Sequence, residues 1–135
     1  MIERMVKALL IAALGFPTLV IASWFAGPSL LTGDNEMSEP RSEVHAAELD
    51  GTIYVAGGIG FFRTLSSCEA FEIATQTFSR CPDLPRSLHH VGMAAGEGQV
   101  FASGGYVSLP FNQDPAGALF SLDVTGGGEV WVELD

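Results

Sequence analysis

The chain contains an internal repeat, and a repeat limits the fold more strongly than local propensity because each copy must form the same unit. The copies begin with PRSEVHAAELDGTIYVAGG at residues 40–58 and PRSLHHVGMAAGEGQVFASGG at residues 85–105. Alignment pairs Arg41 with Arg86, His45 with His90, and Gly57 with Gly104. The first two pairs are 45 residues apart and the third is 47 apart, so we expect two extra residues in the first hairpin of the second copy.

A second pair of similar segments completes the copies: SSCEAFEIATQTFSR at residues 66–80 and AGALFSLDVTGGGEVWVELD at residues 116–135. Alignment there pairs Phe71 with Phe120 and Phe78 with Trp131. β-Branched and aromatic content, with turn signals between, divides each copy into four short strands. The expected strands span residues 44–48, 52–56, 67–73 and 77–80 in the first copy, and residues 91–95, 99–103, 118–123 and 129–133 in the second.

The turns between the first two strands differ in the two copies. Asp50-Gly51 suits a two-residue hairpin loop, because both residues tolerate positive φ. Gly96, Glu97 and Gly98 predict a longer turn in the second copy. Four antiparallel strands in every 45 to 50 residues are typical of a β-propeller blade. The sequence therefore predicts an all-β fold of two four-stranded antiparallel sheets.

These features resemble the Kelch repeat. The resemblance depends on a Gly-Gly pair that closes the second strand, an aromatic residue before it, and a late aromatic residue. The residues are Gly57, Gly58, Gly104, Gly105, Tyr54, Phe101, Phe78 and Trp131. Phe78 departs from the family, which usually has tryptophan there. The resemblance implies one Kelch blade at residues 41–84, a second at residues 85–135, and hence a partial β-propeller.

The resemblance implies a closed ring of six or seven blades, and two blades alone would leave large apolar faces in water. We expect missing blades to come from a longer chain, of which this is a fragment, or from self-association of several chains. A poorly folded chain is the third alternative. The final WVELD stops where a Kelch unit would continue into a link such as CPDLP at residues 81–85, which favours the fragment.

Residues 1–31 are predicted to be a signal peptide or a transmembrane anchor. The nineteen residues 8–26 carry no charge, and as a helix of about 28 Å they would nearly match a hydrocarbon core of about 30 Å. The choice stays open because the run is long for a signal peptide but contains Gly15 and Pro17. Basic residues before the run predict that the bulk of the chain is extracytoplasmic, either secreted or membrane-anchored. Residues 32–40 are expected to be a linker.

Charge excludes one class of partner. Beyond residue 31, four arginines stand against fifteen acidic residues, which gives a net charge of −11. Such a surface repels phosphate backbones, so we expect no nucleic-acid partner. Cationic or neutral partners fit better.

No pattern typical of catalysis, of a cofactor or of a metal site is found. His45, His89 and His90 lack partners at metal-binding spacing, and the repeated position of His45 and His90 predicts a structural role. The glycine pairs do not open a helix, so they do not form a phosphate-binding loop. We predict no catalytic, cofactor or metal residues, and no cofactor.

Cys68 and Cys81 are candidates for a disulfide. If the third and fourth strands pair about a turn between residues 74 and 75, Cys68 faces Cys81 and Phe71 faces Phe78. Antiparallel partners have Cα atoms about 4.5 to 5.5 Å apart, within the range of a disulfide. An oxidising compartment would preserve the bond. The alternative is two separate buried thiols.

The loops between the second and third strands should carry any ligand site, because propellers bind ligands through loops at one end. The candidates are Phe61, Phe62 and Arg63 in the first copy and Tyr106, Phe111, Asn112, Gln113 and Asp114 in the second. Aromatic and polar side chains together suit a peptide or a sugar. The alternative is that these aromatic residues pack between blades.

The leading interpretation is an exported or membrane-anchored Kelch-repeat binding module for a protein or carbohydrate, with residues 8–26 in the membrane if they are not cleaved. The resemblance also implies an alternative, part of an extracytoplasmic Kelch-type carbohydrate-active enzyme such as a copper-radical sugar oxidase or a sialic-acid mutarotase. The sequence does not favour an enzyme, because Tyr54 and Tyr106 have no cysteine or histidine arranged beside them for a copper site. A nonfunctional gene remnant is a third alternative.

Overall fold

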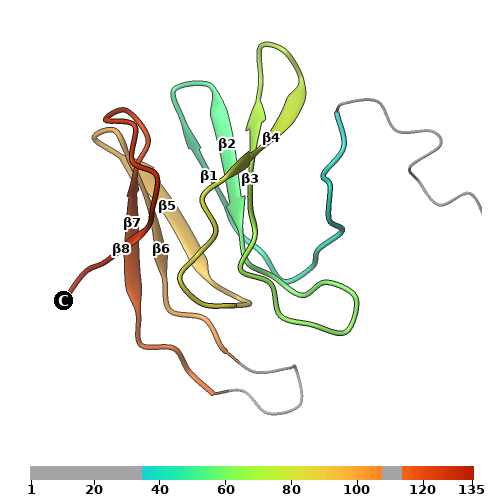
Figure 1. Ribbon diagram of the computed structural model, residues 1–135, viewed down its shortest axis with the longest axis vertical. Helices are drawn as coiled ribbons and strands as arrows, with labels where there is room; N and C mark the ends of the chain where they lie inside the picture. Colours follow the sequence, from blue (N-terminus) through green and yellow to red (C-terminus); the bar gives the residue numbers. More distant parts are fainter. Residues whose placement is uncertain (1–34, 108–113) are drawn as a thin grey trace, which may run out of the picture. The chain divides into compact units, whose positions relative to one another are not determined.

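The computed structural model describes residues 35–107 and 114–135 (Figure 1). All regular secondary structure in these residues is β, in two four-stranded antiparallel sheets whose strands follow the order of the sequence. The first sheet, blade 1, contains β1 (Ala46–Leu49), β2 (Thr52–Ala56), β3 (Cys68–Glu72) and β4 (Thr77–Cys81). The second, blade 2, contains β5 (Gly92–Gly96), β6 (Gln99–Ser103), β7 (Leu119–Asp123) and β8 (Val132–Glu133).

The two predicted sheets are confirmed, and most strand limits lie within two residues of the expected ones. The largest difference is β8, which has two residues where five were expected. The predicted N-terminal helix, and with it the whole signal peptide or transmembrane anchor expected at residues 1–31, lies outside the described residues. In the part of the chain that is described, no helix has the length and apolar character needed to cross a membrane.

The alignment of the histidines is wrong. Glu43 and His90 occupy the same position, because each has a φ of 55° and lies just before the first strand of its blade. They are 47 residues apart, the same spacing as Gly57 and Gly104. His45 therefore has no histidine counterpart in blade 2, and a role shared through the repeat is excluded for it.

The two first hairpins have loops of equal length, so the longer turn expected in blade 2 is also wrong. Gly96 is the last residue of β5 and pairs with Gln99 of β6. Only Glu97 and Gly98 lie between the strands, and both have positive φ. Two positive φ values give the loop a twist that matches the strands, as in a type I′ turn. The two extra residues lie instead in the link before β5.

Sheet register changes the alignment of the third strands as well. Tyr54 of β2 faces Ala70, whereas Phe101 of β6 faces Ser121. With Ala70 and Ser121 as equivalents, Phe71 corresponds to Leu122 and not to Phe120. Phe120 takes the place that Glu69 has in blade 1.

The β3–β4 hairpin has the register that the turn position predicts, with Cys68 opposite Cys81 and Phe71 opposite Phe78. A disulfide joins the two cysteines, whose Cα atoms are 5.1 Å apart. The two phenylalanine rings have centroids 4.8 Å apart. The hairpin is thus closed covalently at the end where the β2–β3 loop enters it.

One face of blade 2 packs on one face of blade 1. The packed face of blade 2 consists of residues that are at most 5% exposed: Val100, Ala102, Phe120, Leu122 and Trp131. They share one core with Ala47, Ala56 and Cys68 of blade 1, and β5 lies against β1. Trp131 also donates a hydrogen bond from Nε1 to the oxygen of Pro82 at 2.7 Å. Burial of this apolar face stabilises the joint between the blades.

The paired glycines allow the link between the blades to approach the end of β2. A Cβ added to Gly57 would lie 2.3 Å from the oxygen of Leu88, and the NH of Gly58 donates to that oxygen at 2.7 Å. Leu88 is fully buried, and its own NH donates to the oxygen of Leu65. At Gly104 of blade 2 an added Cβ would meet no described atom within 4 Å. Both Gly57 and Gly104 have positive φ, but of these two only Gly57 is approached closely, by the link that leads to blade 2.

Candidate functional site

The tip of the β2–β3 loop displays two aromatic side chains to solvent. Phe61 is 87% exposed and Phe62 is 82% exposed, and their ring centroids are 4.3 Å apart. The NH of Gly60 donates to the oxygen of Arg63 at 2.9 Å, so the two phenylalanines form the whole tip of a tight turn. These two residues therefore do not pack between the blades.

Phe62 has a φ of 60°. This left-handed conformation favours glycine or asparagine and is strained for a bulky side chain. Such strain is retained when the surrounding structure imposes it, and it is concentrated at ligand sites. The turn thus combines two costs, an exposed apolar pair and a strained backbone, at one point of the surface.

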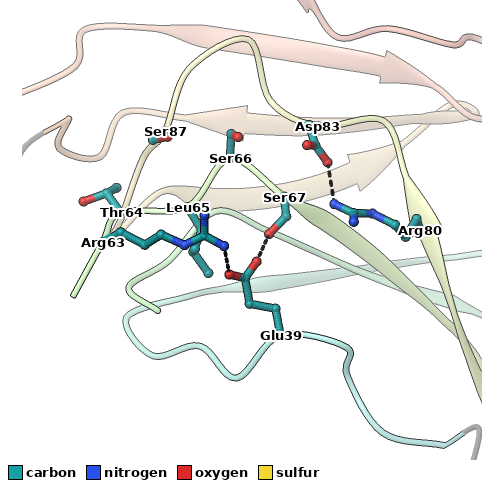
Figure 2. A pocket seen from close by; sticks show the side chains of 9 residues that line it. All are labelled: Glu39, Arg63, Thr64, Leu65, Ser66, Ser67, Arg80, Asp83 and Ser87. Carbon is teal, nitrogen blue, oxygen red and sulfur yellow. Dashed lines mark hydrogen bonds and ion pairs between the residues drawn. The ribbon is translucent and has the colours of Figure 1, made fainter. Parts of the chain in front are cut away.

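A polar cleft of about 220 Å³ lies beside this turn (Figure 2). Its lining comes from the segment before blade 1, the β2–β3 loop, β4 and the link between the blades. The lining residues are Glu39, Arg63, Thr64, Leu65, Ser66, Ser67, Arg80, Asp83 and Ser87. Most of them offer hydroxyl or charged groups, so the cleft suits a ligand with hydrogen-bonding groups.

Glu39 is the centre of the charge network in the cleft. Its carboxylate forms an ion pair with Arg63 and accepts a hydrogen bond from Oγ of Ser67 at 2.9 Å (Figure 2). Burial raises the pKa of Glu39, but hydrogen bonds from Arg63 and Ser67 and the charges of Arg63 and Arg41 outweigh it, so the pKa lies below the ordinary value of 4.5. Glu39 is therefore ionised at neutral pH.

Arg63 keeps much of its surface in water, since its side chain is 68% exposed. A second ion pair joins Arg80 to Asp83 at 3.4 Å, also with exposed side chains. Pairs of this kind contribute little to stability, because water screens them. A charged group of a ligand can therefore take the place of one residue in either ion pair at a low cost in free energy.

A buried arginine holds the two ends of the β2–β3 loop together. Arg41 donates from Nη1 to the oxygens of Gly57 and Ser67 at 2.9 and 2.7 Å, and from Nη2 to the carboxylate of Glu69 at 2.9 Å. The side chains of Arg41 and Glu69 are only 1% and 3% exposed. The Nε atom of Arg41 has no hydrogen-bond partner in the described part of the chain. The loop is thus anchored at its base while its tip projects.

The disulfide fixes the cleft from another direction. Cys68 directly follows the loop residues that line the cleft, and Cys81 directly follows Arg80 and precedes the link that carries Asp83. The bond therefore joins the polypeptide segments on two sides of the cleft. The structure places no reactive free thiol here, since the described residues contain no unpaired cysteine.

The corresponding loop of blade 2 leaves the same end of its sheet (Figure 1). Tyr106 is partly buried, with its ring 5.6 Å from that of His89 and 5.9 Å from that of His90. Asp114 is exposed, and its main-chain oxygen accepts a hydrogen bond from Val107. Neither Tyr106 nor Asp114 lines the cleft. The other candidates of this loop, Phe111, Asn112 and Gln113, lie outside the described residues.

The histidines connect the two blades. His90 contacts Glu43 of the segment before β1 through Nε2 at 2.8 Å, and its Nδ1 lies 2.6 Å from Nδ1 of the fully buried His89. His45 contacts the main-chain oxygen of Val91 through its Nδ1 at 3.0 Å. Within residues 35–107 and 114–135, no group of three or more histidine, cysteine or acidic side chains is placed to hold a metal ion.

The structure brings three residues that the sequence predicts, Phe61, Phe62 and Arg63, to one turn beside the cleft. The remaining polar residues of the cleft are not predicted from the sequence. Ser66, Ser67, Arg80, Asp83 and Ser87 belong to no motif, and only the fold brings their segments together. Arg41 carried a usable signal, because its repetition as Arg86 indicates a structural role for an otherwise ordinary charge.

Comparison with protein-family models gives a match to part of the chain. No curated protein matches the chain. Residues 40–85, which contain all of blade 1, match the family model of the Kelch motif. Blade 1 thus carries a Kelch motif, and blade 2 repeats its antiparallel four-strand arrangement.

Proposed function

We propose that the chain is a protein-recognition module that binds its partner through the turn at Phe61 and Phe62 and the adjoining cleft. The Kelch motif suggests protein binding. The observation that carries the proposal is the pair of neighbouring phenylalanines, 87% and 82% exposed, in a turn that holds Phe62 in a left-handed conformation.

The turn is suited to binding because it is preorganised. The hydrogen bond from Gly60 to Arg63 closes the tip, and Arg41 secures the base of the loop. A fixed aromatic pair loses little conformational entropy when a partner covers it. Aromatic residues and arginine are also the side chains most enriched at the centres of protein interfaces. The expected ligand is a peptide segment that places an apolar side chain on the two rings and polar groups in the cleft.

We place this function outside the cytoplasm, either secreted or at a membrane surface. The Cys68–Cys81 disulfide supports this location, because such bonds persist in oxidising compartments. The uncharged run at residues 8–26 supports export or anchoring by its length and composition. Aromatic rings beside polar groups also fit a sugar, so a carbohydrate is the second candidate ligand.

Selection from a random peptide library on the immobilised chain tests the site. We expect the selection to enrich peptides that bind the Phe62→Ala variant at least about tenfold less tightly than the parent chain. A loss of this size is typical of residues at the centre of an interface. Arg63→Ala should also weaken them. Ile73→Ala is the matched control, because Ile73 is an exposed apolar residue (46%) after the opposite end of β3.

Equal binding of the selected peptides to the Phe62→Ala and Ile73→Ala variants would contradict the proposed site. A glycan array run in parallel separates the two ligand classes. Sugar binding that depends on Phe62, in the absence of any selected peptide, would replace protein recognition with carbohydrate recognition.

A further inference from the structure

Blade 2 has an apolar sheet face on the side away from blade 1. Leu119, Val132 and Leu134 are 38%, 55% and 37% exposed. The side chains of Phe101, Ser121 and Val132 share this face, because these residues are paired neighbours across β6, β7 and β8. Leu134 lies opposite Leu119, to whose oxygen its NH donates at 2.8 Å. We call this surface the outer face of blade 2.

The outer face of blade 2 corresponds to the face of blade 1 that blade 2 covers. By sheet register, Phe101 is the counterpart of Tyr54, and Leu119 is the counterpart of Cys68. Tyr54 and Cys68 belong to the core between the blades or pack against it. One copy of this face is therefore already occupied by a neighbouring sheet, and the second copy is exposed.

Blade 1 presents the complementary surface. Its side away from blade 2 carries four apolar residues in adjoining positions, the outer face of blade 1: Ile53, Val55, Phe71 and Phe78. None of the four is buried. Their counterparts in blade 2 are Val100, Ala102, Leu122 and Trp131, which fill the core between the blades. The outer face of blade 1 thus repeats the apolar surface that blade 2 packs against blade 1, except that Glu69, buried beside Arg41, stands where blade 2 has Phe120.

From this correspondence we propose that the outer face of blade 2 binds the outer face of blade 1 of a second copy of the chain. The contact repeats the packing of blade 2 on blade 1, with mainly apolar residues on each side apart from the Glu69–Arg41 pair. It is a head-to-tail contact between different surfaces, so copies add in one direction until a ring closes or growth stops. The Phe61–Phe62 turn belongs to neither face and stays available.

Two variants that each block one face test this arrangement. Val132→Glu places a charge on the outer face of blade 2, and Phe78→Glu places one on the outer face of blade 1. The full chain at about 100 µM and about 0.15 M salt, where the acidic surfaces are screened, is expected to sediment as a dimer or larger. Each variant alone is expected to be monomeric. An equimolar mixture should form a dimer, because each variant retains the face that the other lacks.

Photo-crosslinking locates the contact independently of total mass. A benzophenone side chain at position 132 of an isotopically labelled copy should crosslink to peptides that contain Ile53, Val55, Phe71 or Phe78 of an unlabelled copy. The same probe at position 62 should not. Leu119→Lys and Val55→Lys replace the two blocking variants if circular dichroism shows that either is unfolded.

Three results would overturn the head-to-tail contact. The first is a monomeric parent chain that gives no crosslink from position 132. The second is assembly that persists in both blocking variants with crosslinks to other segments, which would assign it to another part of the chain. The third is failure of the mixed variants to associate, or a dimer formed by one blocking variant alone, which would indicate contact between identical faces.

Discussion

Blade 1 and blade 2 share strand order and register but are stabilised by different interactions. In blade 1 the disulfide closes the last hairpin, and β4 has five residues. In blade 2 the same positions hold Leu119 and Leu134, and β8 has two residues. The shorter and unlinked edge strand of blade 2 is therefore the part of the two sheets that we expect to open first.

The equivalent arginines show the same contrast. Arg41 is buried and forms an ion pair with Glu69. Arg86 lies over the ring of Phe120, with 5.5 Å from its guanidinium carbon to the ring centroid, and its ion pair with Glu133 is exposed. Each arginine thus has a carboxylate partner, but the pair of Arg41 is buried, whereas that of Arg86 is exposed and its guanidinium lies over an aromatic ring.

The difference follows the position of each blade in the molecule. Blade 2 provides the apolar face that fills the core, and Phe120 suits that role better than a carboxylate. Blade 1 provides the loop and the cleft, where the buried ion pair and the disulfide fix backbone ends. One repeat thus contributes most of the packing, and the other holds the proposed binding site in place.

The largest expected effect is a difference in stability between variants of the two arginines. Arg41→Ala leaves the Glu69 carboxylate buried without its cation, and it removes the donors to Gly57 and Ser67. We expect a loss of about 4 kcal/mol in the free energy of unfolding. Arg86→Ala should cost less than about 1 kcal/mol, because an exposed pair is weak. Urea unfolding of both variants measures the difference, and equal losses would remove this distinction between the blades.

The second prediction compares the inner face of blade 2 with the outer face of blade 1. Leu122 and Phe71 are counterparts by register, but Leu122 is 1% exposed and Phe71 is partly exposed. Leu122→Ala should cost about 3.5 kcal/mol through a cavity in the core. Phe71→Ala should cost about 1 kcal/mol although it deletes more atoms, since it loses mainly its contact with Phe78.

Chemical denaturation at a concentration low enough to keep the chain monomeric measures both losses. Under that condition the outer face of blade 1 is in water. A larger loss for Phe71→Ala than for Leu122→Ala would mean that the outer face of blade 1 is covered within a single chain.

The third prediction concerns the disulfide that blade 1 has and blade 2 lacks. Replacing Cys68 and Cys81 by alanine opens a loop of 13 residues in sequence separation. The expected loss is about 3 kcal/mol, mainly because the unfolded chain gains conformational freedom. The variant should also bind selected peptides less tightly, because the two segments beside the cleft are no longer joined. Calorimetric melting with and without reductant measures the stability, and identical melting would show that the bond is dispensable.

Much of the fold could be predicted because its signals are local. The limits of β2 and β6 agree with the expected ones, since each strand lies between a hairpin turn and a Gly-Gly pair. The register of Cys68 with Cys81 follows from the position of one turn. The two-residue offset between the copies was misplaced because an alignment gap has no fixed position until backbone pairing defines it.

The site was only partly predictable for a different reason. Phe61, Phe62 and Arg63 are unusual in a loop and can be noticed in the sequence. The polar residues of the cleft are ordinary serines and charged residues on separate segments, and their proximity depends on tertiary packing. Burial of Glu69 beside Arg41 also has no local signature, because charged residues in strands usually face water.

The smallest expected effect is a pH dependence specific to blade 1. Glu39 has a lowered pKa in the folded chain, so its contribution is present above the ordinary pKa of 4.5 and is lost as the pH falls through the folded value. Glu39→Gln should reduce stability by a fraction of a kcal/mol near pH 7, since Arg63 is 68% exposed and screened by water. Between about pH 5 and pH 3 the parent chain should lose more stability than this variant. Ser67→Ala removes one hydrogen bond to the carboxylate, so its stability should fall with pH less steeply than that of the parent chain and more steeply than that of Glu39→Gln. Melting temperatures measured at each pH check this order. If the parent chain and Glu39→Gln lose stability in parallel as the pH falls, the Glu39–Arg63 contact contributes nothing to the folded state.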